Sequence, residues 1–101
     1  MLKITVFTAL LIVPTITLGA GATESACLRS DRSPGREACA CAQSVADQTL
    51  SRGDQKIAAR IIKDPDHFYK YYGSKNPRNQ AFLERYRAWG TAAHEFCRPN
   101  S

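Results

Sequence analysis

The sequence has few of the residues on which most enzymes and metal proteins depend. It contains two histidines, one methionine and one tryptophan, and it has no Gly-x-Ser-x-Gly turn of the kind that positions a hydrolase nucleophile. No stretch alternates apolar and polar residues as a half-buried strand does. The net charge of +5 is spread along the chain, unlike the clustered basic stripe of a nucleic-acid-binding protein. We therefore expect a non-enzymatic, helical protein that takes no cofactor and binds no nucleic acid.

The chain also lacks an apolar run long enough to cross a membrane. Lys3 precedes an apolar stretch over residues 4–13, and Pro14 interrupts it well before the roughly 20 apolar residues that a transmembrane helix needs. Ala20-Gly21-Ala22 has the small-x-small pattern of a signal-peptide cleavage site. The sequence predicts a signal peptide over 1–22, which is removed, and a single helical domain over 23–101 that is exported to the periplasm or secreted.

Four cysteines follow the predicted cleavage site: Cys27, Cys39, Cys41 and Cys97. An even number of cysteines in a short exported chain predicts two disulfides. Residues two apart on a helix point about 200° away from each other, so Cys39 and Cys41 should hold partners on different sides. We expect Cys97 to pair with one of them and Cys27 with the other. The preferred pairing is Cys39–Cys97 with Cys27–Cys41, because Cys39 lies further into the apolar face of its helix.

After position 22 the sequence contains many residues that are typical of helices and of helix ends. Long helices are expected over 34–50, 52–63 and 77–97, and short ones near 23–28 and 65–72. Four polar residues are placed to cap these helices, three of them directly before a proline: Ser33, Ser51, Asp64 and Asn76. If the last helix returns antiparallel to the 34–50 helix, its end reaches the paired cysteines. The expected fold class is all-α, a small disulfide-stapled helical bundle.

Helical spacing also predicts which faces are buried. The last helix carries an apolar seam spaced four, three, four and three, formed by Phe82, Tyr86, Trp89, Ala93 and Phe96. The 52–63 helix should face the core with Ile57, Ala58, Ile61 and Ile62. The 34–50 helix has apolar residues on one side and a polar side opposite, consisting of Gln43, Ser44, Asp47 and Gln48.

The segment from Cys39 to Arg60 contains Cys-Ala-Cys, Val-Ala-Asp and Thr-Leu-Ser, followed by Asp-Gln. Together with the aromatic helix that ends at Cys97, this segment resembles a family of short exported bacterial proteins with four cysteines and a helical fold. Members of the family are sometimes labelled arginine transporter. Because no spanning segment remains after cleavage, the resemblance implies at most a soluble binding component, and it implies no catalytic residues.

Aromatic and cationic residues cluster around the short 65–72 helix. Phe68 and Tyr72 are four apart and should pack inward, which leaves Tyr69 or Tyr71 elsewhere. Tyrosine and arginine are enriched in protein interfaces, although a small domain also leaves some aromatic residues exposed without a function. The sequence therefore predicts a monomeric module that binds a partner protein through Tyr69, Lys70, Tyr71, Lys75 and Arg78.

An alternative function depends on free thiols. His94 and Cys97 are three apart on one helix face, so both could reach one ion, and thiolates with imidazole suit zinc or copper. A periplasmic metal carrier would use Cys39, Cys41, His94 and Cys97. The disulfide interpretation is favoured because exported thiols oxidise and because the single methionine, Met1, is removed with the signal peptide.

Overall fold

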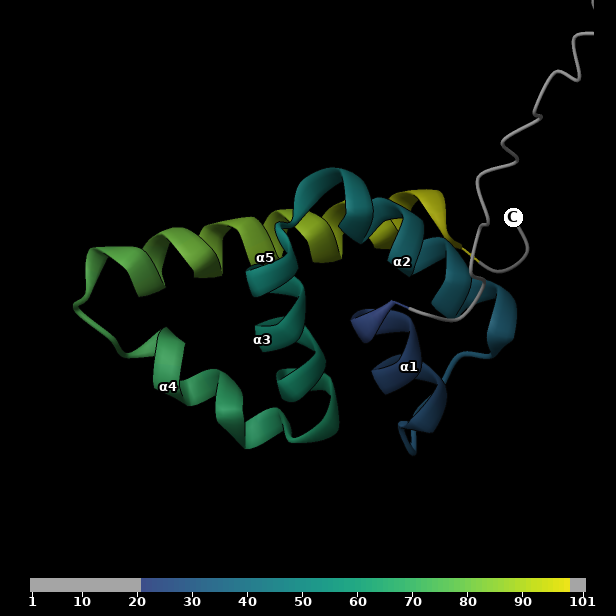
Figure 1. Cartoon of the computed structure of the whole chain (residues 1–101), viewed down its shortest axis with the longest axis horizontal. Helices are drawn as coiled ribbons and strands as arrows, with labels where there is room; N and C mark the ends of the chain where they lie inside the picture. Colours follow the sequence, from purple (N-terminus) through teal and green to yellow (C-terminus); the bar gives the residue numbers. More distant parts are fainter. Residues whose placement is uncertain (1–20, 99–101) are drawn as a thin grey trace, which may run out of the picture.

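The computed structural model describes residues 21–98. These residues form five α-helices and one short 3₁₀ helix, with no strand anywhere between Gly21 and Arg98 (Figure 1). In chain order the elements are α1 (Ala22–Arg29), α2 (Arg36–Thr49), α3 (Arg52–Lys63), η1 (Pro65–Phe68), α4 (Tyr69–Tyr72) and α5 (Pro77–Phe96). Two disulfides join helices, so the expected disulfide-stapled all-α bundle is confirmed. The predicted signal peptide over 1–22 lies outside the described residues except for Gly21 and Ala22.

Three of the four predicted caps are confirmed. The Ser51 hydroxyl accepts a hydrogen bond from the backbone N–H of Asp54 at 3.1 Å, which begins α3. Asp64 caps η1, and the Asn76 side chain accepts from the N–H of Arg78 at 2.9 Å at the start of α5. These caps satisfy N–H groups that have no partner inside their own helix.

The predicted cap at Ser33 is wrong, because α2 begins only at Arg36. Gly35 precedes the helix with a φ of 108°, a backbone conformation that glycine adopts without the steric cost of a side chain. The Ser33 hydroxyl accepts instead from the N–H of Gly35 at 3.2 Å. Ser33 therefore stabilises the turn that leads into α2 rather than the helix itself.

α2 and α5 form a layer, and the remaining elements project from it. α2 and α5 lie along one side of the molecule, while α1 and α3 run side by side away from it in the same direction (Figure 1). η1 and α4 lead back to α5. As expected, the end of α5 lies beside the start of α2, and the Trp89 ring nitrogen donates to the carbonyl of Ala42 at 3.0 Å. Within the described residues, no helix is both long and apolar enough to span a bilayer.

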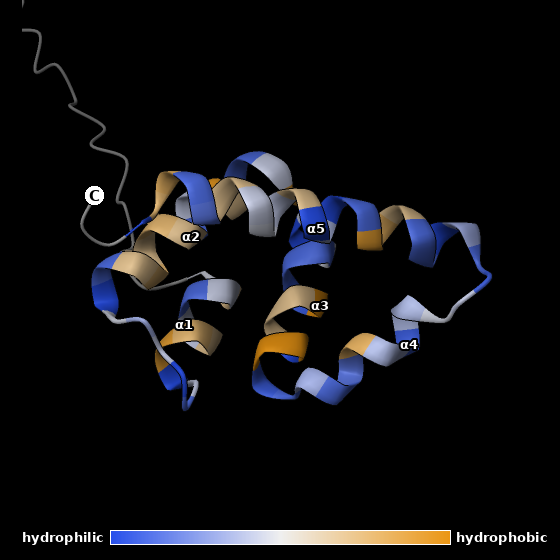
Figure 2. Ribbon diagram, turned by 180° about the vertical axis from the view of Figure 1, so that it is seen from behind, coloured by the Kyte–Doolittle hydropathy of each residue, from blue (hydrophilic) through white to orange (hydrophobic). Residues whose placement is uncertain are grey.

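The core consists of two apolar clusters with Tyr86 packed against both. One contains Ala46, Leu50, Ala58 and Trp89, and the other contains Ile61, Tyr71 and Phe82. The most hydrophobic stretch of α3 is at its C-terminal end, next to η1 (Figure 2). The α5 seam is buried as predicted at Phe82 and Trp89, but the prediction is wrong at Phe96, which is 78% exposed. Phe96 is the last residue of α5 and lies beyond the part of the helix that packs against the two core clusters.

The predicted polar side of α2 is wrong at Gln43, which is buried. Its side-chain oxygen accepts from the Thr23 hydroxyl and from the N–H of Glu24 at 2.9 Å. Its side-chain nitrogen donates to Asp47 at 2.8 Å and to Gln55 at 2.7 Å. One buried amide thus joins α1, α2 and α3, because α1 covers this side of α2.

Gln55 completes this connection. Gln55 donates to the carbonyls of Ala46 and Leu50, each at 3.3 Å, and thereby satisfies carbonyls at the end of α2. The polar groups between these three helices are paired with one another rather than with water.

Candidate functional site

All four cysteines form disulfides, but the preferred pairing is wrong. The bonds are Cys27–Cys39 and Cys41–Cys97. The broader expectation is confirmed, since Cys39 and Cys41 hold different partners and Cys97 bonds to one of them. Cys39 is the more buried, at 0% exposed, but its face of α2 is covered by α1 rather than by α5. Cys39 therefore meets Cys27 on α1, and Cys41 meets Cys97 just after the end of α5.

These bonds remove the ligands of the alternative metal site. The sulfur atoms of Cys39, Cys41 and Cys97 are bonded to other sulfurs, and a thiol must be free and deprotonated to bind zinc or copper. His94 lies exposed in the last turn of α5. In the part of the chain that the structure describes, no three His, Cys, Asp or Glu side chains are grouped to hold a metal ion.

The predicted interaction surface around α4 requires one correction, at Tyr71. Tyr71 is 7% exposed, and its ring packs against Phe82 with a centroid distance of 5.0 Å. Tyr72, which was expected to pack inward, is 58% exposed. The reason is that α5 covers the side of α4 on which Tyr71 lies, while Tyr72 stacks on Phe68 outside that contact.

The exposed rings of Tyr69 and Tyr72 form a packed cluster with the partly buried ring of Phe68, and Arg87 lies beside them. We call these four residues the aromatic surface. Phe68 and Tyr72 stack with centroids 5.5 Å apart, and Tyr69 meets Tyr72 edge-on at 6.4 Å. The Arg87 guanidinium lies 5.9 Å from the centre of the Tyr72 ring, within the range of a cation–π interaction. The predicted residues Lys70, Lys75 and Arg78 are exposed nearby in the sequence.

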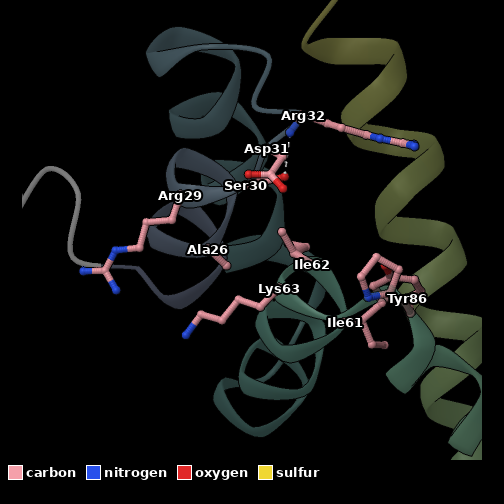
Figure 3. A pocket seen from close by; sticks show the side chains of 10 residues that line it. Ala26, Arg29, Ser30, Asp31, Arg32, Ile61, Ile62, Lys63 and Tyr86 are labelled. Atoms are coloured by element: carbon pink, nitrogen blue, oxygen red, sulfur yellow. Dashed lines mark hydrogen bonds between the residues drawn. The ribbon is translucent and has the colours of Figure 1, made fainter.

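A second site was missed by sequence reasoning and lies beside α1 and α3. An open pocket of about 660 Å³ has a floor that includes Ala26, Ile62 and Tyr86 and a rim that includes Arg29 and Lys63 (Figure 3). A neighbouring hollow of about 520 Å³ shares Arg29 and Lys63 and adds Lys56 and Arg60. We call the two together the α1–α3 groove.

The sequence indicates one part of this groove, namely the cations on α3. Lys56, Arg60 and Lys63 are spaced by four and three, which places them on one face of a helix. What the sequence does not show is that Arg29, from a helix more than 20 residues earlier, lies beside that face. The groove exists only because α1 packs against α3.

Two side chains near these sites have shifted pKa values. Burial raises the pKa of the Tyr86 phenol above its usual 10.0. The pKa of Arg85 is raised chiefly by its side-chain hydrogen bonds to Asp54, at 2.7 and 3.1 Å. This bidentate ion pair ties the start of α3 to α5.

Comparison with protein-family models, with curated proteins and with solved structures yields no match for this chain. The resemblance of residues 39–60 to the exported bacterial four-cysteine family therefore stays a prediction. The aromatic surface and the α1–α3 groove are the two candidate binding sites of the described residues.

Proposed function

We propose that this protein is an exported, non-enzymatic module that binds a partner protein through the aromatic surface. The observation that carries the proposal is the exposure of Tyr69 and Tyr72, at 66% and 58%, within a cluster of stacked rings. Covering these rings with a partner would remove apolar area from water, which favours binding. A partner that covers both rings would bury apolar area without having to order flexible side chains.

The chemistry of this surface favours a protein as the partner. Tyrosine and arginine supply most binding hot spots in protein interfaces. The stacking of Phe68 on Tyr72 and the guanidinium of Arg87 restrict the rings before binding, which lowers the entropy cost of association. Lys70, Lys75 and Arg78 add positive charge, so the expected partner presents an acidic patch.

Export is part of this proposal. Two disulfides in a short chain are compatible with an oxidising compartment outside the cytosol, and the signal peptide over 1–22 provides the route. The exported chain is expected to begin at Thr23 and to contain no free thiol. Intact-mass measurement before and after thiol alkylation tests both expectations, and a retained Met1 or an alkylated cysteine would contradict them.

The binding experiment compares two matched double variants. Tyr69→Ser with Tyr72→Ser removes the two exposed rings, whereas Leu28→Ser with Phe96→Ser removes two other exposed apolar side chains, at 41% and 78%. Partners are cross-linked in the native exported fraction, identified, purified and titrated directly. We expect affinity to fall about tenfold or more for the tyrosine variant and to stay unchanged for the control. Equal binding by both variants would exclude the aromatic surface.

A further inference from the structure

The α1–α3 groove is lined by cations from two helices. Arg29 comes from α1, and Lys56, Arg60 and Lys63 lie on one face of α3. Arg32 follows α1 and lies at the other side of the pocket. All five are exposed. Between residues 21 and 98 the one ion pair joins Asp54 to Arg85, so no acid of the described chain pairs with these cations.

The helix dipoles explain only part of this charge. Arg29, Arg60 and Lys63 are in the last turns of their helices, where a cation offsets roughly half a negative charge at each C-terminus. Lys56 lies in the middle of α3, and Arg32 lies beyond α1, so neither serves this purpose. With Asp31 the single acid in the lining, the groove retains an excess of positive charge.

The floor of the groove is apolar, and its charges are spread along its length. Ile61, Ile62 and Tyr86 line the floor. Figure 3 shows Arg29 and Lys63 extending away from this floor on one side, while Arg32 reaches toward α5 on the other. Because the charged ends do not converge on one point, they suit several anionic groups along a chain better than one small anion.

We propose that the α1–α3 groove binds an acidic peptide segment of a partner protein, one in which carboxylates alternate with apolar side chains. The apolar side chains would occupy the floor beside Ile62 and Tyr86, and the carboxylates would face the cations that line the groove. A nucleic acid would use the cations, but its phosphates would leave the apolar floor uncovered. The groove shares no residue with the aromatic surface, and the proposal does not depend on that surface.

The probe is a short synthetic peptide of alternating glutamate and leucine, titrated into the exported, disulfide-bonded chain. Two comparison peptides replace every leucine by serine or every glutamate by lysine. The groove variant is Arg29→Glu with Lys63→Glu, and the control is Arg36→Glu with Arg52→Glu, which makes the same charge change at exposed positions that line neither the groove nor the aromatic surface. Lys56→Gln with Lys63→Gln is a milder groove variant in case the first fails to fold.

We expect the glutamate–leucine peptide to bind, to weaken as salt is added, and to shift the amide NMR signals of α1 and α3. The Glu groove variant should lower its affinity about tenfold and the Gln variant less, while the control pair leaves it within about twofold. Equal loss in groove and control variants would overturn the proposal, since net charge alone would then explain binding. It would also be overturned if the glutamate–serine peptide bound equally well, or if single-stranded DNA bound more tightly and displaced the peptide.

Discussion

The two ends of this molecule are stabilised in different ways. Around α1 and the start of α2 the buried residues are small or polar, namely Thr23, Glu24, Ala26, Cys39 and Gln43. Around α4 and α5 they are large, namely Tyr71, Phe82, Leu83 and Trp89. Both disulfides join the start of α2 to a neighbouring segment. Covalent bonds are therefore found around the start of α2, where the buried residues are small or polar, and aromatic packing dominates around α4 and the first half of α5.

This difference in buried residues shows how so short a chain can form a stable fold. A buried alanine contributes far less apolar area than a buried tryptophan, so an end built from alanines gains little from packing alone. Disulfides act chiefly by restricting the unfolded chain, and they need no large side chains in the native state. The Gln43 network adds specificity at the same end, because every polar partner there must be in place.

The largest expected effect comes from removing the disulfides one at a time. Cys41→Ala with Cys97→Ala opens a loop of 56 residues, and Cys27→Ala with Cys39→Ala opens one of 12. The chain-entropy relation predicts losses in the free energy of unfolding of about 4 and about 3 kcal/mol, measurable by urea denaturation.

Hydrogen exchange on the same variants sharpens the comparison between the two ends. Loss of Cys27–Cys39 should remove protection first from amides of α1, while amides of α5 near Phe82 stay protected. Equal loss of protection at both ends would show that the two regions do not differ in how they are stabilised.

A smaller effect is expected from Gln43→Leu. The substitution leaves the Thr23 hydroxyl and the N–H of Glu24 without their acceptor, and an unsatisfied buried polar group costs about 1–3 kcal/mol. Gln48→Leu makes the same change at an exposed position of α2 and should alter the free energy of unfolding by less than about 0.5 kcal/mol. If the two variants were equally stable, the network would not stabilise the fold.

The smallest expected effect is a pH dependence of stability that arises from Tyr86 on α5. Because burial raises the pKa of Tyr86 in the folded state, its contribution to stability is fully present below the unfolded pKa of about 10. That contribution is lost as pH rises from there through the folded pKa, since the unfolded chain releases its proton first. Tyr86→Phe should make the alkaline decline in melting temperature shallower. Tyr69→Phe, at an exposed ring, is the control, and an equal change in both would rule out burial of Tyr86 as the cause.

Local signals in the sequence were sufficient for the helices and most of their ends. Ser51, Asp64 and Asn76 cap helices as predicted, because a cap depends only on residues within one turn. The even number of cysteines was likewise sufficient to predict that the helical bundle contains two disulfides. The misplaced start of α2 came from a turn at Gly35, whose positive φ overrode the serine–proline pattern before it.

Contacts between helices determined three features that the sequence does not predict. The choice of Cys27 for Cys39, the burial of Gln43 and the α1–α3 groove all follow from one packing arrangement, in which α1 lies against both α2 and α3. Helical periodicity specifies which residues share a face, but it carries no information about which other helix that face meets. The exchange of Tyr71 for Tyr72 has a related cause, since Tyr71 meets Phe82 on α5, and the sequence does not show which side of the short helix α5 covers. Capping and spacing act within one helix, whereas pairing, burial and the binding surfaces depend on which helices become neighbours.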